Sequence, residues 1–321
     1  KEKNVGIVAN KGSIIRNGSK YIHLVDSLIL LGINIKKVFA PEHGFRGDQD
    51  AGEKISDQVD KKAKIKIVSL YGKKRKPKPE DLKDIEILIL HFKHLKKFLS
   101  TSGNPKPFIS KYWCPQDDKN IKEGERAYFT NKNACIIDKM MYYIKNRVEP
   151  KYQSLLLGPL LVQCSIHNNT NGQFSAYYKN EEKTKGMYGG KKKVDLKRIT
   201  GEIIPKMPIL TEHKANIHIS QMDANKWIKT IPKVDIVYYD PPYNKHPYNL
   251  YYFLLDIINE WNTELEVPDT YRGQPKNWTP SPFCSFKNAK EAFEDLIKNT
   301  KSKYILVSYN NKGIIPLDEL D

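Results

Sequence analysis

The stretch from Val234 to Asn249 reads VDIVYYDPPYNKHPYN, and it decides the fold expected for the C-terminal two-thirds of the chain. Apolar and aromatic residues run into Asp240-Pro241-Pro242-Tyr243. This pattern predicts a buried strand that ends abruptly at a carboxylate, two rigid prolines and an aromatic ring. Parallel α/β sheets bind their ligands at the carboxyl ends of the strands. We therefore expect a site at the end of this strand.

The residue types at this strand end suit one kind of chemistry. An exocyclic amino group attacks a methyl sulfonium only when its lone pair is freed from the ring. The Asp240 carboxylate and the carbonyl before Pro241 can accept the two N–H bonds of such an amine, while Tyr243 stacks on a base rotated out of its helix. Asp240, Pro241, Pro242 and Tyr243 are therefore the candidate catalytic residues. The alternative is a Pro-Pro turn in which Asp240 is only a turn residue.

The composition is that of a folded protein with room for two domains. The chain has 321 residues, 39% of them hydrophobic, and a formal net charge of +17. Because the excess of Lys and Arg is spread along both halves, charge alone does not mark a nucleic-acid surface. No run approaches the roughly 18 apolar residues of a membrane span. We expect no membrane partner.

The four cysteines lie far apart, without a C-x-x-C pair or a neighbouring His at metal spacing. Neither a disulfide framework nor a metal site is therefore predicted, and a reducing compartment, the cytoplasm, is expected. We also expect the protein to be a monomer. The chain begins Lys-Glu-Lys without Met. It is interpreted as a processed or truncated product from which a signal peptide cannot be read.

The first 90 residues predict half of an open parallel sheet. Strands are expected at Val5–Ala9, Ile35–Phe39, Ile65–Leu70 and Ile85–Leu90, with a helix at Tyr21–Leu31. A loop dense in Gly and charge follows the second strand, where an α/β sheet keeps its working residues.

The loop Pro41-Glu42-His43-Gly44-Phe45-Arg46-Gly47, with GIVAN before it and VSLYG after it, resembles the N-terminal part of the exo-β-N-acetylmuramidases. The resemblance implies that Glu42, with His43 and Arg46 in the same loop, is the carboxylic acid at a glycosidic bond of peptidoglycan fragments. A loop that merely bridges two elements is the alternative. The resemblance stops near Leu90.

Residues 91–108 are predicted as a junction, followed by a domain over 109–321. Its helix Tyr152–Cys164 is apolar nearly all round and is expected to be buried. The turn Asn169-Thr170-Asn171 can either satisfy a backbone bend or read base edges and phosphates. The run 179–193, rich in Gly and Lys, is expected to be a mobile loop that lies along DNA.

Two carboxylates are expected at the ends of successive strands. Asn216–Ser220 is predicted as a strand that closes at Asp223, and one helix fits between Asp223 and the strand before Asp240. One carboxylate would hold a cofactor and the other the target amine. Later elements are a helix from Tyr248, a helix at Ala289–Lys298 and a buried strand at Lys303–Tyr309.

Residues from about 109 onward resemble the Dam-like adenine-specific (N6) DNA methyltransferases of restriction–modification systems. The matching motifs are ERAYFTNKNACIIDKM, NNTNG, DPPYN and YILVSYNNKGI. The resemblance implies that Asp240 to Tyr243 hold a flipped adenine of double-stranded DNA, and that Asp223 and Tyr239 contact S-adenosylmethionine. The DNA-binding residues would be Asn169, Thr170, Asn171, Asn244, Tyr248 and Arg272.

The fold class expected from both resemblances is α/β, with two Rossmann-like parts. The first is a partial parallel sheet over 1–90. The second is an incomplete methyltransferase fold over 109–321, with a helical and loop target-recognition insertion at about 130–210 and a catalytic sheet at about 214–321.

One departure from the methyltransferase pattern concerns the cofactor. The Phe-x-Gly-x-Gly turn that cradles the methionine end of the cofactor in that class does not occur in this sequence. The chain is therefore interpreted as a chimera, either a gene fusion or two joined reading frames, with impaired methyl transfer. The alternatives are a glycosidase acting through Glu42 and a DNA-binding remnant without catalysis.

Overall fold

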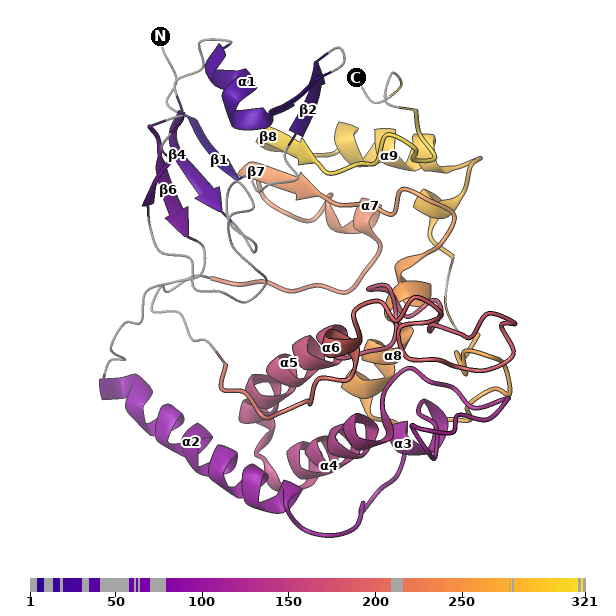
Figure 1. Ribbon diagram of the computed structural model, residues 1–321. Coiled ribbons are helices and arrows are strands. Elements are labelled where there is room, and N and C mark those ends of the chain that lie inside the picture. The colour runs from indigo at the N-terminus through magenta and orange to yellow at the C-terminus, as the bar shows by residue number, and fades with distance from the viewer. Residues whose placement is uncertain are drawn as a thin grey trace. The chain divides into compact units, whose positions relative to one another are not determined.

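The chain divides into two compact units, Lys1–Lys78 and Pro79–Asp321. Figure 1 shows the computed structural model. It describes residues 5–8, 14–17, 20–30, 35–40, 58–60, 62, 64–69, 79–208, 216–276, 278, 280–316 and 319.

The first unit contains a small sheet that is mostly parallel. Its elements are β1 (Val5–Val8), β2 (Ile14–Asn17), β3 (Lys20–His23), α1 (Leu24–Leu30), β4 (Ile35–Ala40), β5 (Gln58–Val59) and β6 (Lys66–Ser69). The sheet order is β1-β4-β6-β5, with β4 parallel to both β1 and β6 and with β5 antiparallel to β6. The predicted strands at Val5, Ile35 and Ile65 are confirmed by β1, β4 and β6.

The helix predicted at Tyr21–Leu31 begins three residues late. Lys20–His23 form β3 instead, because they pair antiparallel with β2 in a hairpin that the sequence analysis did not predict. The loop that carries Glu42, His43 and Arg46 lies outside the described residues.

The second unit begins with one long helix, α2 (Pro79–Leu99). The strand predicted at Ile85–Leu90 is therefore wrong. Leu88 and Leu95, seven residues apart, are buried, whereas Leu90 is 52% exposed. Seven residues are two helical turns, so the apolar run supplies one face of a helix and no strand.

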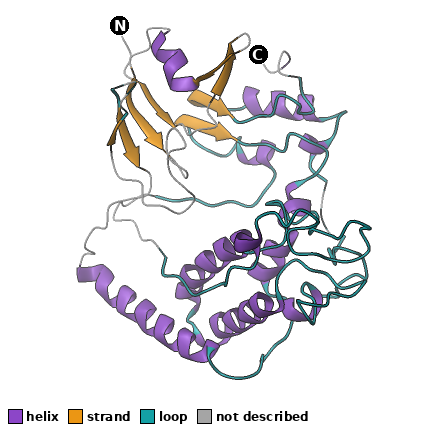
Figure 2. Cartoon of the chain, viewed as in Figure 1, coloured by secondary structure: helices purple, strands orange, loops and turns teal. Residues whose placement is uncertain are grey.

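The helical part of this unit comprises α2 with α3 (Ile109–Tyr112), α4 (Asn131–Arg147), α5 (Pro150–Ile166), α6 (Leu196–Ile199) and α8 (Tyr248–Glu260), together with the loops between residues 100 and 208. Figure 2 shows helices joined by long loops in this part. Its core is aromatic: the Phe108 ring meets the rings of Trp113 and Trp261 edge to face, each at 5.5 Å. Edge-to-face pairs add to the stabilisation from burial.

The rest of the unit is a half-sheet. Its elements are α7 (Ala224–Trp227), β7 (Val234–Tyr239), the 3-10 helix η1 (Pro282–Cys284), α9 (Ala289–Lys298) and β8 (Ser302–Val307). β7 and β8 pair in parallel from Val234↔Ser302 to Tyr239↔Val307. Both strands and the helix at 289–298 are confirmed.

The burial expected of the half-sheet is only half correct. Val237 and Tyr239 are buried with Phe283 and Phe293 in one small core, but Ile236, on the opposite face of β7, is 58% exposed. Among the described residues, helices cover one face of the strand pair, so only alternate residues are buried. β8 is likewise mostly exposed.

The segment Asn216–Ser220 is exposed and forms no strand, which corrects the second predicted strand end. The α/β class is nevertheless confirmed, since both units combine helices with parallel strand pairs. No helix among the described residues is long and apolar enough to cross a membrane.

Candidate functional site

A cavity of about 240 Å³ opens where β7 ends. It is lined by Gln173, Asp240, Pro242, Tyr243, Asn244, His246, Tyr248, Tyr251, Tyr252 and Ser308. The volume lies below the roughly 300–1,000 Å³ of pockets that take drug-sized ligands, and it suits a single planar ring system. Three of the four residues predicted to be catalytic line this cavity. Pro241 is buried and is not part of the lining.

The Asp240 carboxylate accepts no hydrogen bond from any described residue, and the residue is exposed. Its backbone carbonyl accepts a hydrogen bond from the Tyr248 hydroxyl at 2.8 Å. Burial, followed by the negative charge of Asp240, raises the pKa of Tyr248 to about 12. Tyr248 therefore keeps its proton at neutral pH and remains a donor. One lone pair of the carbonyl is left for another partner.

Tyr243 is held from the segment that follows β8. Its carbonyl accepts from the Ile314 amide at 2.9 Å, and its ring meets the Tyr309 ring edge to face at 6.3 Å. The Tyr309 hydroxyl in turn accepts from the Ile315 amide at 3.1 Å. A Cβ at Gly313 would overlap the Tyr309 ring, so only glycine lets the segment pass so close.

Asn244 shapes the turn at the rim of the cavity. Its Oδ1 accepts from the His246 amide at 2.8 Å and from the Tyr251 hydroxyl at 3.1 Å. The predicted DNA contact thus has its oxygen engaged within the chain, and its amide nitrogen makes no hydrogen bond to the described residues.

The polar turn after α5 is buried. Asn169 and Thr170 are each 0% exposed, whereas Asn171 is exposed. The Asn169 amide donates to the Ala127 carbonyl at 2.9 Å, and its oxygen accepts from the Gly189 amide at 3.0 Å. Of the two alternatives that the sequence left open for Asn169 and Thr170, these contacts favour the backbone bend over the reading of bases.

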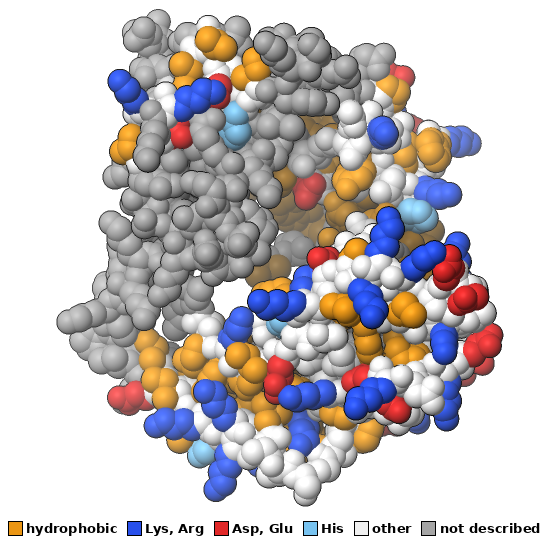
Figure 3. All heavy atoms as spheres, viewed as in Figure 1, with side chains coloured by type: hydrophobic (Ala, Val, Ile, Leu, Met, Phe, Trp, Pro, Cys, Tyr) orange, Lys and Arg blue, Asp and Glu red, His pale blue; other side chains and the backbone are white. Residues whose placement is uncertain are grey.

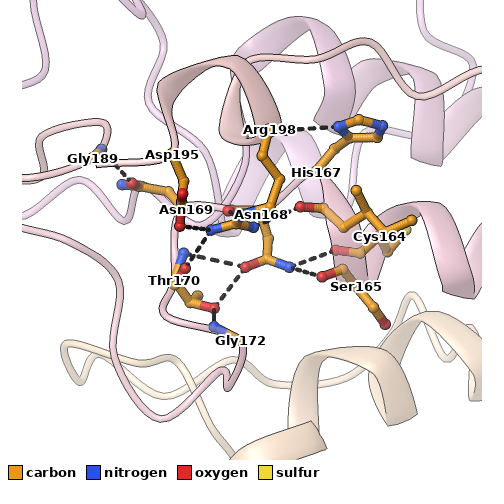
Figure 4. A network of polar contacts seen from close by, with 11 residues as sticks. Cys164, Ser165, His167, Asn168, Asn169, Thr170, Gly172, Gly189, Asp195 and Arg198 are labelled. Atoms are coloured by element: carbon orange, nitrogen blue, oxygen red, sulfur yellow. Dashed lines mark hydrogen bonds and ion pairs between the residues drawn. The ribbon is translucent and has the colours of Figure 1, made fainter. Parts of the chain in front are cut away.

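Figure 4 shows how further groups complete this turn. Asn168 accepts from the Thr170 hydroxyl at 2.6 Å and donates to the Cys164 and Ser165 carbonyls. The Arg198 guanidinium donates to the carbonyls of Asn168 at 3.1 Å and Thr170 at 2.8 Å. Buried polar groups that are fully paired in this way rigidify the segment that carries them.

Arg272 also acts within the chain. Its Nε donates to the Ser175 carbonyl at 2.6 Å, and its guanidinium lies 4.8 Å from the centre of the Tyr271 ring. Its own carbonyl accepts from the Trp113 indole at 3.0 Å. These contacts tie the loop around Arg272 to the segment after the polar turn.

The two predicted cofactor contacts form hydrogen bonds within the chain. Asp223 caps α7 by accepting from the Lys226 amide at 3.0 Å. Tyr239 is buried, and its hydroxyl pairs with the Thr300 hydroxyl at 2.5 Å. Neither residue lines the cavity. The described residues contain no cluster of His, Cys, Asp or Glu able to hold a metal ion.

The sequence analysis missed several residues of the cavity wall: Gln173, His246, Tyr251 and Ser308. The Ser308 amide donates to the Tyr239 carbonyl at 2.8 Å, which places the end of β8 beside the end of β7. The parallel pairing of the two strands could have predicted Ser308. Gln173 carried no such signal, because its loop returns to the cavity from another part of the chain.

Charged side chains are interspersed on the face seen in Figure 3. Blue side chains of Lys and Arg lie among red ones of Asp and Glu over the described residues. Within the predicted Lys-rich loop, Lys191 pairs with Glu181. Lys179 instead lies over the rings of Tyr177 and Tyr271, with its Nζ 4.6 Å from the centre of the latter.

Comparisons find that the chain is similar to two different kinds of known protein. Residues 5–95 match the family described as exo-beta-N-acetylmuramidase NamZ, N-terminal. The peptidoglycan beta-N-acetylmuramidase NamZ of Bacillus subtilis is 38% identical over 93 residues, which are 28% of this chain and 21% of that protein.

The larger match is to methyltransferases. The type II methyltransferase M.NlaIII of Neisseria lactamica is 31% identical over 205 residues, covering 61% of this chain and 55% of that protein. The type II methyltransferase M.CviAII of Paramecium bursaria Chlorella virus 1 is 28% identical over 196 residues, covering 60% and 53%.

The chain spans about half the length of these two methyltransferases. No solved structure matches it. The double resemblance predicted from the sequence is confirmed: the chain is similar to type II methyltransferases over about three-fifths of its length, and to the N-terminal part of an exo-β-N-acetylmuramidase over residues 5–95.

Proposed function

We propose that the chain is a site-specific DNA methyltransferase that transfers a methyl group from S-adenosylmethionine to N6 of a flipped adenine. The observation that carries the proposal is the cavity at the end of β7, where the unpaired Asp240 carboxylate and the Tyr243 ring share one ring-sized space. The similarity to type II methyltransferases supports it.

The residues of the cavity suit the acceptor half of this reaction. The Asp240 carboxylate accepts one N–H of the adenine amino group, and the free lone pair of the carbonyl before Pro241 accepts the other. These two bonds hold the nitrogen lone pair out of the ring and toward the methyl donor. Tyr243 stacks on the base, which replaces the stacking lost when the base leaves the duplex.

The residues expected to contact the methyl donor do not line the acceptor cavity. The Asp223 carboxylate caps α7 and Tyr239 is buried against Thr300, so neither reaches the cavity. S-adenosylmethionine would supply the methyl group, but no step of the reaction follows from these two side chains. We therefore expect the acceptor pocket to bind its base and methyl transfer to be slow.

Double-stranded DNA is the proposed partner. Lys179 and the exposed Asn171 lie on the loops beyond α5, in a segment where several other lysines are exposed. Lysine side chains neutralise phosphates, which makes affinity fall steeply with salt. The pairing of some of them with acidic neighbours predicts a modest slope.

A labelled-methyl assay tests the proposal. The protein is incubated with radiolabelled S-adenosylmethionine and mixed-sequence DNA, and the digested nucleosides are separated to identify N6-methyladenine. Asp240→Ala is expected to lower labelling about 100-fold, because a preorganised charge partner of the reacting amine is lost. Asp235→Ala is the matched control, since Asp235 is exposed at the start of the same strand. Equal labelling by wild type and Asp240→Ala would end the proposal.

The placement of Asp223 and Tyr239 favours one second candidate, a DNA-binding protein without catalysis. This candidate predicts binding that weakens with salt and that S-adenosylmethionine does not alter. Fluorescence anisotropy of labelled duplex DNA, with and without the cofactor, separates it from the methyltransferase.

The match of residues 5–95 favours another candidate, a glycosidase acting on peptidoglycan fragments. Its predicted site, Glu42 with His43 and Arg46, lies outside the described residues. Release of N-acetylmuramic acid from such fragments by wild type, and its loss in Glu42→Gln, would support this activity.

A further inference from the structure

Gln173 lines the cavity together with Asp240, although it comes from the helical part and Asp240 from the half-sheet. Its carboxamide forms no hydrogen bond with any described residue. A carboxamide offers two donors and one acceptor, so an unpaired one in a small polar cavity is available to a ligand.

The backbone holds Gln173 firmly from both sides. The Gly172 amide donates to the Thr170 hydroxyl at 3.1 Å, and the Phe174 amide donates to the Tyr251 carbonyl at 2.8 Å. The Phe174 carbonyl accepts from the Tyr128 hydroxyl at 2.9 Å, deep in the core. The main chain around Gln173 is fixed, and its side-chain amide is left available to bond a ligand.

We propose that Gln173 recognises the target base by donating its amide N–H to the unprotonated ring nitrogen beside the exocyclic amine. Adenine carries such an acceptor at N1, whereas hypoxanthine has an N1–H donor there and an oxygen in place of the amine. The Gln173 amide N–H is thus complementary to adenine. Hypoxanthine requires the carboxamide to turn its oxygen toward N1–H, and its own oxygen meets the two acceptors of Asp240. This inference rests on the proposed function.

The proposal also explains what the buried turn after α5 does: it holds the loop that carries Gln173. Asn168, Asn169 and Thr170 do not face the cavity, but their hydrogen bonds fix the loop that leads to Gln173 (Figure 4). They are positioning residues. A side chain that reads a base through one hydrogen bond needs the main chain that carries it to be held in place.

Binding of free nucleosides tests Gln173 without requiring methyl transfer. Saturation-transfer NMR is recorded on the full chain with deoxyadenosine and deoxyinosine in competition. Wild type is expected to prefer deoxyadenosine. Gln173→Glu, which has acceptors only, is expected to lose about tenfold in deoxyadenosine affinity and to shift its preference toward deoxyinosine. Gln173→Ala is expected to keep only the part of the discrimination that Asp240 supplies.

Gln221→Glu serves as the matched control, because Gln221 is an exposed glutamine that does not line the cavity. An unchanged preference in Gln173→Glu, with binding lost in Asp240→Ala, would overturn the inference and leave the proposed function standing. Absence of deoxyadenosine binding by a wild type that still methylates DNA would also overturn the inference alone. Absence of both binding and methylation would overturn both proposals.

Discussion

The helical part and the half-sheet of the second unit are built differently, although both contribute to one cavity. The helical part closes around a large aromatic core, whereas the described helices cover the half-sheet on one face only. Gln173 and Tyr251 come from the first, Asp240 and Ser308 from the second. Gln173, which would recognise the base, is therefore supported by the large core of the helical part. Asp240, which would hold the amine, is supported by the smaller core of the half-sheet.

The largest expected effect on the free energy of unfolding comes from a buried residue of α2 in the helical part. Leu95→Ala is expected to lower the free energy of unfolding by about 3 kcal/mol, because Leu95 is 0% exposed and leaves a cavity. Leu90→Ala, on the exposed face, is expected to stay within about 0.5 kcal/mol. All four tryptophans follow residue 78, so their fluorescence during urea unfolding reports on the second unit alone. Equal effects would place α2 outside the core.

The buried turn gives the next largest effect. Asn169→Ala removes an amide that bonds the Ala127 carbonyl and the Gly189 amide, leaving buried groups unpaired, and should cost about 2 kcal/mol. Asn171→Ala should cost little. If Asn169→Ala left the unfolding midpoint unchanged but weakened DNA binding, the base-reading alternative would be restored.

Adjacent residues of β7 compare the two faces of the half-sheet directly. Val237→Ala should cost about 1.5 kcal/mol, the transfer of two buried methyl groups. Ile236→Ala removes a larger side chain but should cost less than about 0.5 kcal/mol, because that face is exposed. A larger cost for Ile236→Ala in urea unfolding would mean that its face is covered in solution.

The smallest expected effect is a pH dependence of stability that comes from His91, where α2 meets α4. Burial, helped by the neighbouring His94 and opposed by Glu149, lowers the pKa of His91, which lies 3.3 Å from the Tyr143 hydroxyl. The folded state favours the neutral imidazole. The contribution of His91 to the free energy of unfolding is therefore fully present above the ordinary pKa of about 6.5. It is lost as the pH falls from there through the lowered pKa of the folded state.

The difference between wild type and His91→Gln isolates this contribution. Urea midpoints at pH 7.5 and pH 5.5 should drop less on acidification in the variant than in wild type. Identical drops would assign the acid sensitivity to other groups.

The sequence predicted the strands and helices whose apolar pattern is unambiguous. β7, α9 and the parallel sheet of the first unit fall where expected. Ile85–Leu90 was misassigned because a short, continuous apolar run fits a buried strand and one side of a helix equally well. The helix start at Pro79-Glu80-Asp81 was the signal that could have decided it.

The sequence predicted the part of the cavity that follows β7, but not the part that the loop after α5 contributes. Asp240 and Tyr243 are neighbours in sequence, so the motif itself places them together. Burial of Asn169 and the approach of Gln173 depend on how the loop after α5 folds onto Tyr128 and Tyr251, and no local pattern encodes such a long-range contact. Asp223 does not lie at a strand end, because the strand expected at 216–220 does not form, and its contact with the cofactor stays a prediction.

Because α2 is one continuous helix, the number of residues between Leu88 and Leu95 decides which way each side chain points. The match to the muramidase family ends at residue 95, inside a helix whose buried residues Leu88 and Leu95 face one core. One residue inserted between them would rotate the earlier leucine by about 100° away from that core, whereas seven would restore its direction. The register of α2 therefore decides whether Leu88 reaches the same core as Leu95.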